Sequence, residues 1–354
     1  KAVEHVEGLP DLTAGEKSYD TIEAARNLLY FKESPTVFSR TPLEIKKTYE
    51  DKGVQVNTYD DFTSYGIEKL MDSDYKCRIL TGVINLAVFQ VLVATIAKVE
   101  IKKTTLNSTQ KVSMLMKLKL DLSFSGLAVF FNISSNTARS YFYCTVQQAS
   151  VILKPLIKFP SKEEILSNMP ICFNDFRSTR VILDCTEISI EESKCLRCRI
   201  RSYSNYKGTH TVKYLIGIAS SGLITFLSKG YGGRASDKAI FNAEHLIDQL
   251  DPGDAIMVNK GILIEKECME KFVKLIYPPF LKRNAKQFSK EDPQKTASIA
   301  RARVHVKRAI QRLKIFKICQ GKLLWTLLPY MDDIMIIIAG LTNLGPPILA
   351  QDKF

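Results

Sequence analysis

The stretch "TRVILDCTEISIEE", from Thr179 to Glu192, decides the fold class of this 354-residue chain. Apolar and β-branched residues dominate it, and an extended strand places successive side chains on opposite faces. The alternation puts Val181, Leu183, Cys185 and Glu187 on one face and Ile182, Asp184, Thr186 and Ile188 on the other. The pattern predicts a β-strand that carries Asp184 on one face and Glu187 on the other, among apolar neighbours.

The segments after this strand predict the rest of a sheet. "HTVKYLIGIAS" and "GLITFLSKGY" are two further strand patterns, separated by the turn "SSG". After them come a helix capped by Ser236, the strand "AIMVN", the helix "EKECMEKF", the short strand "KLIYPP" and a basic helix from about Lys295 to Phe316. The order β-β-β-α-β-α-β-α predicts an α/β domain of the ribonuclease H-like kind, with one mixed sheet flanked by helices.

The segment before the first strand predicts helices. In "LSFSGLAVFFNISSNTARSYFYCTVQQASVIL" (Leu122 to Leu153), apolar residues recur at helical spacing, "NIS" makes a short turn, and Ser134 or Ser135 can cap a second helix. The early, polar positions of that second helix are Asn136, Thr137, Arg139 and Ser140. In a helix-turn-helix such positions face the major groove of DNA. An ordinary αα-hairpin within a helical bundle is the alternative interpretation.

The charge of the chain is distributed unevenly. The net charge is +13, and residues 1–100 hold 12 Lys and Arg against 16 Asp and Glu, which gives −4. The remainder therefore holds 38 basic against 21 acidic residues, or +17. A basic region of this size favours nucleic acid as the partner of residues 101–354. The alternative is a basic protein without such a partner.

The basic residues are densest between Lys282 and Lys317, where twelve Lys and Arg face two acids. Side chains at this density suit a phosphate backbone, and binding through them falls steeply with salt. The predicted DNA-binding residues here are Lys282, Arg283, Lys286, Arg301, Arg303, Arg308, Arg312 and Lys314. The alternative is a basic surface that is inherited and no longer used.

The eight cysteines predict neither a disulfide framework nor a metal centre. Most of them lie in apolar runs, which indicates free thiols in a reducing compartment. Cys195 and Cys198 form one CxxC, but zinc needs four ligands and no second pair follows. The apolar run from Ile79 to Ala97 is interrupted by Asn85 and Gln90, so it is expected to be a buried core helix and not a membrane span.

Ordered motifs over residues 110–350 resemble the PIF/Harbinger-like group of DDE-type transposases. The matching pieces include "LSFSGLAVFFNIS" with "NTARSYF", "VILDCTEISIE", "YSNYKGTHTVKYLIGIASSGLITFLSKGYGGRASDKAI", "PGDAIMVNKG", "PPFL", "RVHVKRAIQRLKIFKI" and "GLTNLGPP". The resemblance implies three parts: an acidic, mostly helical region (1–100), a helical domain containing a helix-turn-helix (101–178) and a ribonuclease H-like, transposase-derived domain (179–354).

The resemblance also implies a catalytic site, and this chain departs from it. The family holds two Mg²⁺ with two Asp and one Glu, because two ions about 3.5–4 Å apart need anionic oxygens around them. The first Asp falls on Asp184, the second on Asn259 in "VNKG", and the Glu on Lys307 in "HVKRAI". We therefore expect a lost Mg²⁺ site, no cofactor, and an ion pair between Lys307 and Asp184 in place of the metals.

These observations favour a domesticated, catalytically inactive transposase in the nucleus. Its expected role is that of a non-catalytic regulator which binds DNA or chromatin and a protein partner in chromatin or transcription regulation, with no membrane association. Self-association into a homo-oligomer is left open. One alternative is a protein-interaction scaffold whose DNA binding is vestigial. Another is an active nuclease with a rearranged site.

Overall fold

The structure is a computed structural model of the whole chain, and it describes residues 71–99, 107–279, 291–346 and 348. The predictions for residues 1–70 fall outside these described residues. So do three of the predicted DNA-binding residues, Lys282, Arg283 and Lys286.

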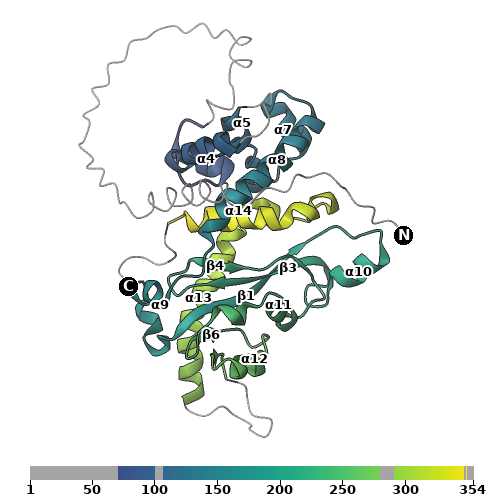
Figure 1. Cartoon of the computed structure of the whole chain (residues 1–354). Helices are drawn as coiled ribbons and strands as arrows, with labels where there is room; N and C mark the ends of the chain where they lie inside the picture. The colour runs from purple at the N-terminus through teal and green to yellow at the C-terminus, as the bar shows by residue number, and fades with distance from the viewer. Residues whose placement is uncertain (1–70, 100–106, 280–290, 347, 349–354) are drawn as a thin grey trace, which may run out of the picture.

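The described residues before the sheet are helical (Figure 1). The helices are α3 (Asp74–Thr81), α4 (Leu86–Val99), α5 (Ser108–Ser113), α6 (Met116–Leu120), α7 (Phe124–Phe131), α8 (Ser135–Leu153), η1 (Lys154–Leu156), α9 (Lys162–Ser167) and η2 (Ile171–Phe176). The apolar run that was expected to be one helix is split between α3 and α4, which are bent by 61°. The break follows from Gly82, which ends α3 in the left-handed conformation with φ 80°.

Local capping explains how α7 and α8 meet. Ser123 caps α7, and Asn132 ends it with a left-handed φ of 50°. Ser134 then caps α8, because its hydroxyl accepts a hydrogen bond from the backbone N–H of Thr137. The prediction of a short turn and a serine cap at this point is confirmed.

One mixed sheet forms the centre of the second half of the chain. Its strands are β1 (Thr179–Ser189), β2 (Tyr203–Ser204), β3 (Thr209–Ile218), β4 (Ile224–Leu227), β5 (Tyr231–Gly232), β6 (Ala255–Met257) and β7 (Lys274–Ile276). The order is β2-β3-β1-β6-β7, with β4 and β5 also paired to β3. β1 runs antiparallel to β3 and parallel to β6, and β6 is parallel to β7. The predicted mixed sheet with flanking helices is therefore confirmed.

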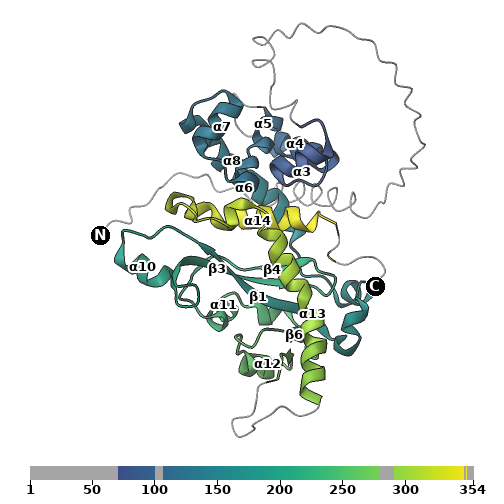
Figure 2. The same ribbon diagram turned by 180° about the vertical axis from the view of Figure 1, so that it is seen from behind.

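Helices cover both faces of this sheet. They are α10 (Leu196–Ser202), α11 (Asp237–Ala243), η3 (Leu246–Gln249), α12 (Glu265–Glu270), α13 (Glu291–Leu313), η4 (Lys317–Cys319), η5 (Trp325–Tyr330) and α14 (Met331–Asn343). The two views show α11 and α12 on one face and α13 on the other (Figures 1 and 2). The sequence predicted neither the inserted α10 nor the two-residue strands β2 and β5.

The alternation along β1 feeds two separate hydrophobic cores. Ile182 and Ile188 join the larger core, which also contains residues of α8, α13 and α14. Val181 and Leu183 join the smaller core under α11 and α12. Asp184 shares the face of Ile182 by the two-residue period of a strand, so it lies on the side that α13 covers.

Helix α14 ties the helical part to the sheet. Near its N-terminus, Asp332 accepts a 2.8 Å hydrogen bond from the buried Tyr214 of β3, and Asp333 accepts a 2.7 Å bond from Ser150 of α8. Within the described residues, the helix over Trp325–Asn343 and the bent α3–α4 pair are apolar and long enough to cross a membrane by length and composition alone. Half of the Trp325–Asn343 window is buried inside the protein, as in a core helix.

Candidate functional site at the carboxyl edge of the sheet

The register of two parallel strands brings Asp184 and Asn259 together. Ile182 of β1 is paired with Met257 of β6. Asp184 and Asn259 each lie two residues after these paired positions, so the two-residue period of a strand places them on the same face of the sheet. Residues separated by 75 positions thus meet where β6 ends beside the middle of β1, and the carboxyl ends of parallel strands are where α/β sheets commonly carry their sites.

The third member of this group is Arg303 of α13. Its Nη1 donates a 3.4 Å hydrogen bond to Asn259 Oδ1, and its Nη2 lies 3.9 Å from Asp184 Oδ2. Arg303 is only 7% exposed. The Nε and Nη2 atoms have no hydrogen-bond partner among the described residues. A buried guanidinium therefore spans the gap between Asp184 and Asn259.

The expected ion pair between Lys307 and Asp184 is wrong. Lys307 is exposed, and the structure shows no contact within 4 Å between it and Asp184, while Arg303 does make one. Lys307 acts on Asp184 only at longer range, where it slightly favours the ionised carboxylate. The reason is geometric, because Arg303 lies one helical turn before Lys307 and points more directly at the sheet.

Burial dominates the acidity of Asp184. Its pKa is raised above the ordinary value, chiefly because burial penalises the charged form and only in part because of Asp237, while the Arg303 guanidinium opposes the rise. Asp237 is the first residue of α11. It forms a 3.3 Å ion pair with Lys213, which is itself 3.3 Å from Glu187.

These donors do not match a two-metal site. Asp184 supplies one carboxylate, and the Asn259 side-chain oxygen already accepts hydrogen bonds from Arg303 and from the backbone N–H of Lys260. Hard divalent ions need several oxygen ligands with enough negative charge, and a guanidinium this close repels them. Among the residues that the structure describes, no three His, Cys, Asp or Glu side chains are placed to hold a metal ion.

The predicted DNA-binding residues divide by exposure. Asn136, Arg139 and Ser140 of α8 are exposed, and so are Arg301 and Arg308 of α13. The remaining four behave differently, and the half-buried Arg312 is described in the next paragraph. Thr137 is half-buried and its hydroxyl hydrogen-bonds to Ser134, Lys314 is half-buried, and Arg303 is buried in the group described above. Arg303 therefore does not belong to the exposed basic surface.

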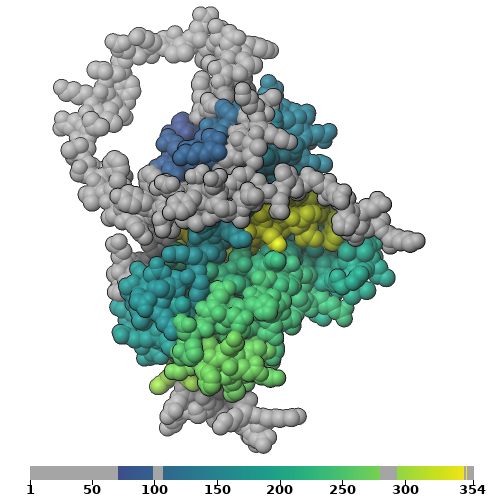
Figure 3. Space-filling model, viewed as in Figure 1, coloured from purple at the N-terminus to yellow at the C-terminus, as the bar shows by residue number. Residues whose placement is uncertain are grey.

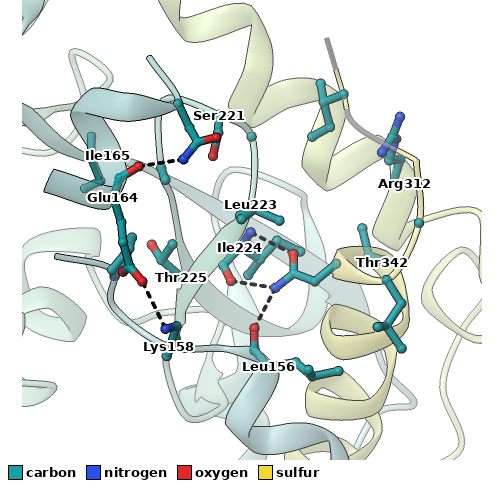
Figure 4. A pocket seen from close by; sticks show the side chains of 18 of the residues that line it. Leu156, Lys158, Glu164, Ile165, Ser221, Leu223, Ile224, Thr225, Arg312 and Thr342 are labelled. Carbon is teal, nitrogen blue, oxygen red and sulfur yellow. Dashed lines mark hydrogen bonds and ion pairs between the residues drawn. The ribbon is translucent and has the colours of Figure 1, made fainter. Parts of the chain in front are cut away.

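Arg312 lines a pocket that is separate from the group around Asp184 (Figure 4). It lines a hollow of about 440 Å³ between β4, α9 and the end of α14, and its Nη1 donates to the backbone oxygen of Pro346. Asn343 fixes the pocket wall, since its side chain bonds to both backbone groups of Ile224 and to the Leu156 oxygen. The pocket shares no lining residue with the group around Asp184.

Sequence reasoning missed two residues of the group. Arg303 was assigned to the exposed surface, although its position one helical turn from Lys307 was a usable signal. Asp237 gave no comparable signal, because its proximity to Asp184 depends on how α11 packs. The Cys195–Cys198 pair has no third metal-ligating residue beside it within the described part of the chain.

Comparison with known proteins covers the sheet and the helices around it. Residues 183–343 match the family model of the DDE superfamily endonucleases. No curated protein and no solved structure matches the chain. The match begins at the residue before Asp184 and ends with α14, so it includes Asn259, Arg303 and Lys307. Over these residues the chain is DDE transposase-like, similar to the DDE superfamily endonucleases.

Proposed function

We propose that this chain is a transposase-derived protein of the PIF/Harbinger type that binds DNA in the nucleus and no longer cuts it. Its sheet would then be a ribonuclease H-like domain that retains the architecture of a nuclease without its metal chemistry. The role that fits best is a non-catalytic regulator acting on chromatin or transcription, together with a protein partner.

The main support for the proposed loss of catalysis is the guanidinium of Arg303, which lies between Asp184 and Asn259. It stands within 4 Å of both side chains, and the exposed Lys307 adds a second positive charge nearby. In-line cleavage with two metals needs ions that activate the attacking oxygen and stabilise the leaving one. One carboxylate facing two cations offers no charge to hold such ions.

Three features support DNA binding. The matched family consists of endonucleases, and residues 101–354 carry an excess of positive charge. The first turns of α8 expose Asn136, Arg139 and Ser140. If α7 and α8 form a helix-turn-helix, these residues are placed to contact the major groove.

A cleavage assay tests the catalytic half of this proposal. Supercoiled plasmid is incubated with the wild-type protein and with Asp184→Ala in Mg²⁺ and, separately, Mn²⁺. We expect no nicking by either protein. Nicking by the wild type that Asp184→Ala abolishes would show an active nuclease and overturn the proposal.

Metal titration isolates the cause of the loss. In the variant Asn259→Asp, Arg303→Ser, Lys307→Glu, the guanidinium beside Asp184 is removed, and the carboxylates at the three family positions rise from one to three. Calorimetry with Mn²⁺ should detect binding to this variant and none to the wild type, because hard cations need anionic oxygens. Equal Mn²⁺ affinity for both proteins would contradict the assignment of the site.

A binding assay tests the DNA-binding half of the proposal. Fluorescence anisotropy with labelled duplex DNA is repeated as salt rises from about 50 to 200 mM, a range over which several phosphate contacts lose orders of magnitude in affinity. We expect binding at low salt with a steep salt dependence. No binding at about 50 mM would favour a protein-interaction scaffold with vestigial DNA binding.

A further inference from the structure

A basic surface lies on α10, which the sequence did not predict, and on the turn after it, which falls in the motif "YSNYKGTH". It comprises the exposed cations Lys194, Arg197, Arg199, Arg201 and Lys207, and we call it the α10 surface. Residues 193–210 contain these five cations and no Asp or Glu, a net charge of +5. The two preceding acids are engaged: Glu192 pairs with Arg199, and Glu191 accepts a hydrogen bond from the backbone of Trp325.

Packing does not account for the composition of α10. Ser202 is its only buried residue. Leu196 is 68% exposed and Ile200 47%. In the turn that follows, Tyr206 is 84% exposed, with the Lys207 ammonium 5.0 Å from its ring centre. Since burial of apolar surface is the main favourable term in folding, a helix so little buried contributes little to the stability of the core.

The base of α10 is nevertheless held firmly. A Cβ atom at Gly232 would lie 2.3 Å from the backbone oxygen of Arg201, and one at Gly233 would lie 2.9 Å from that of Ser202. Only glycine permits this close approach. The Ser202 hydroxyl also hydrogen-bonds to His210 at 2.9 Å. The loop "GYGGR" (residues 230–234) therefore packs closely against the end of α10 and fixes it in place, while the outer face of the helix is exposed to solvent. We call this contact the clamp.

The α10 surface lies on the edge of the sheet that carries the Asp184 group. β1 ends at Ser189, five residues after Asp184, which corresponds to about 17 Å along a strand. α10 begins at Leu196, seven residues after the end of β1, and it protrudes from one side of the molecule in all three views (Figures 1, 2 and 3). A distance of about 17 Å equals roughly five base pairs of B-form DNA at 3.4 Å each.

We propose that the α10 surface is a DNA contact, in which its cations and the Tyr206 hydroxyl hold the phosphate backbone of a duplex that runs past Asp184. Arg, Lys and Tyr are among the side chains that commonly contact phosphate. Four cations remain on this surface besides Arg199, which pairs with Glu192, and this excess positive charge matches the uniform negative charge of a DNA backbone. This inference rests on the proposed DNA binding and adds the place where the duplex lies.

The test removes charge from the α10 surface without touching the clamp. The variant Arg197→Gln, Arg201→Gln, Lys207→Gln changes three exposed side chains. A matched control, Lys266→Gln, Lys271→Gln, Lys274→Gln, removes three exposed charges around α12, which lies at a different end of the molecule (Figure 1). Both variants are compared with the wild type in the full chain, using duplex-DNA anisotropy over a salt series.

The expected result is a selective loss. Each lost phosphate contact lowers the slope of log K against log salt by about 0.9, so the α10 variant should lose about 2 to 3 units of slope. Its affinity at about 100 mM salt should fall on the order of 10- to 100-fold. The control variant should change both quantities far less. Thermal melting checks that both variants remain folded.

The outcomes separate the inference from the proposed function. If the wild type binds and the α10 variant binds equally well with the same slope, the inference alone fails. If the wild type does not bind DNA, the proposed function and the inference fail together. If the α10 variant binds DNA normally but loses affinity for polyglutamate that the wild type shows, the surface suits an acidic protein and the inference is overturned.

Discussion

Two arginine–aspartate pairs stand at either end of the short stretch over which β1 and β6 pair, and they differ in how completely they are satisfied. At the start of β1 and β6, Arg180 Nε donates a 3.1 Å hydrogen bond to Asp254, and Arg180 Nη1 donates to the Pro160 oxygen at 2.9 Å. Asp254 also lies 3.2 Å from Lys162. At the other end, Arg303 and Asp184 approach only to 3.9 Å.

The difference separates a structural pair from a functional remnant. A buried pair stabilises a fold only when further hydrogen bonds satisfy its remaining polar groups. The Arg180–Asp254 pair meets this condition. Arg303 does not, because two of its nitrogens lack a partner among the described residues, and burial raises the pKa of Asp184 despite the nearby guanidinium. Poorly satisfied polar groups of this kind are found where a site once had, or still has, another role.

Removal of one carboxylate from each pair should give the largest contrast. We expect Asp254→Ala to lower the free energy of unfolding by about 3–5 kcal/mol, because it leaves Arg180 buried and unpaired. Asp184→Ala should cost less than about 1 kcal/mol, since the contact that it removes is long and its carboxylate is penalised by burial. Urea unfolding of both variants measures the difference. Equal losses would show that the two pairs are alike.

A double-mutant cycle should sharpen the same comparison. The cycle for Arg180→Met and Asp254→Asn is expected to give a coupling energy of about 2–3 kcal/mol, and the cycle for Arg303→Met and Asp184→Asn less than about 1 kcal/mol. The reason is that only the first pair is joined by a direct hydrogen bond. Calorimetric unfolding of the wild type, the four single variants and the two double variants gives both energies. A larger coupling in the second cycle would mean that Arg303 holds Asp184 in place.

The pH dependence of Asp184→Asn should report the burial of the carboxylate. Because the pKa of Asp184 is raised above 3.8, the folded protein binds more protons than the unfolded chain between pH 3.8 and the raised value. The contribution of Asp184 to the free energy of unfolding therefore falls as pH rises through that window. The variant lacks this loss, so its stability relative to the wild type should increase from acid to neutral pH. A relative stability that decreases would show that the guanidinium outweighs burial.

The smallest expected effect is on the reactivity of the cysteine thiols, and it involves no change in the stability of the protein. Hydrogen bonds from Cys198 lower the pKa of the exposed Cys195 thiol, whereas burial raises that of Cys268 to about 11 and that of Cys319 to about 12. Iodoacetamide reacts with the thiolate, so Cys195 should be alkylated at lower pH than an ordinary thiol, and Cys268 and Cys319 only at higher pH. Peptide mass spectrometry over a pH series gives the order. Labelling of Cys268 at a lower pH than Cys195 would contradict the burial of the Cys268 side chain.

Much of the fold could be predicted because its signals are local. The two-residue period of "VILDCTEIS" separates the side chains that enter the two cores, and Ser134 and Ser236 cap the two helices for which serine caps were predicted. α10 could not be predicted in the same way. Its seven residues have no buried apolar stripe, and periodicity detects only helices that have one.

The candidate site shows where sequence reasoning ends. The sequence by itself determined which positions correspond to the family's carboxylates, because ordered motifs align Asp184, Asn259 and Lys307. Only the tertiary structure decided that Arg303, and not Lys307, stands beside Asp184. The physical reason is that a strand's period is short and local, whereas the rotation of α13 against the sheet depends on the packing of many side chains.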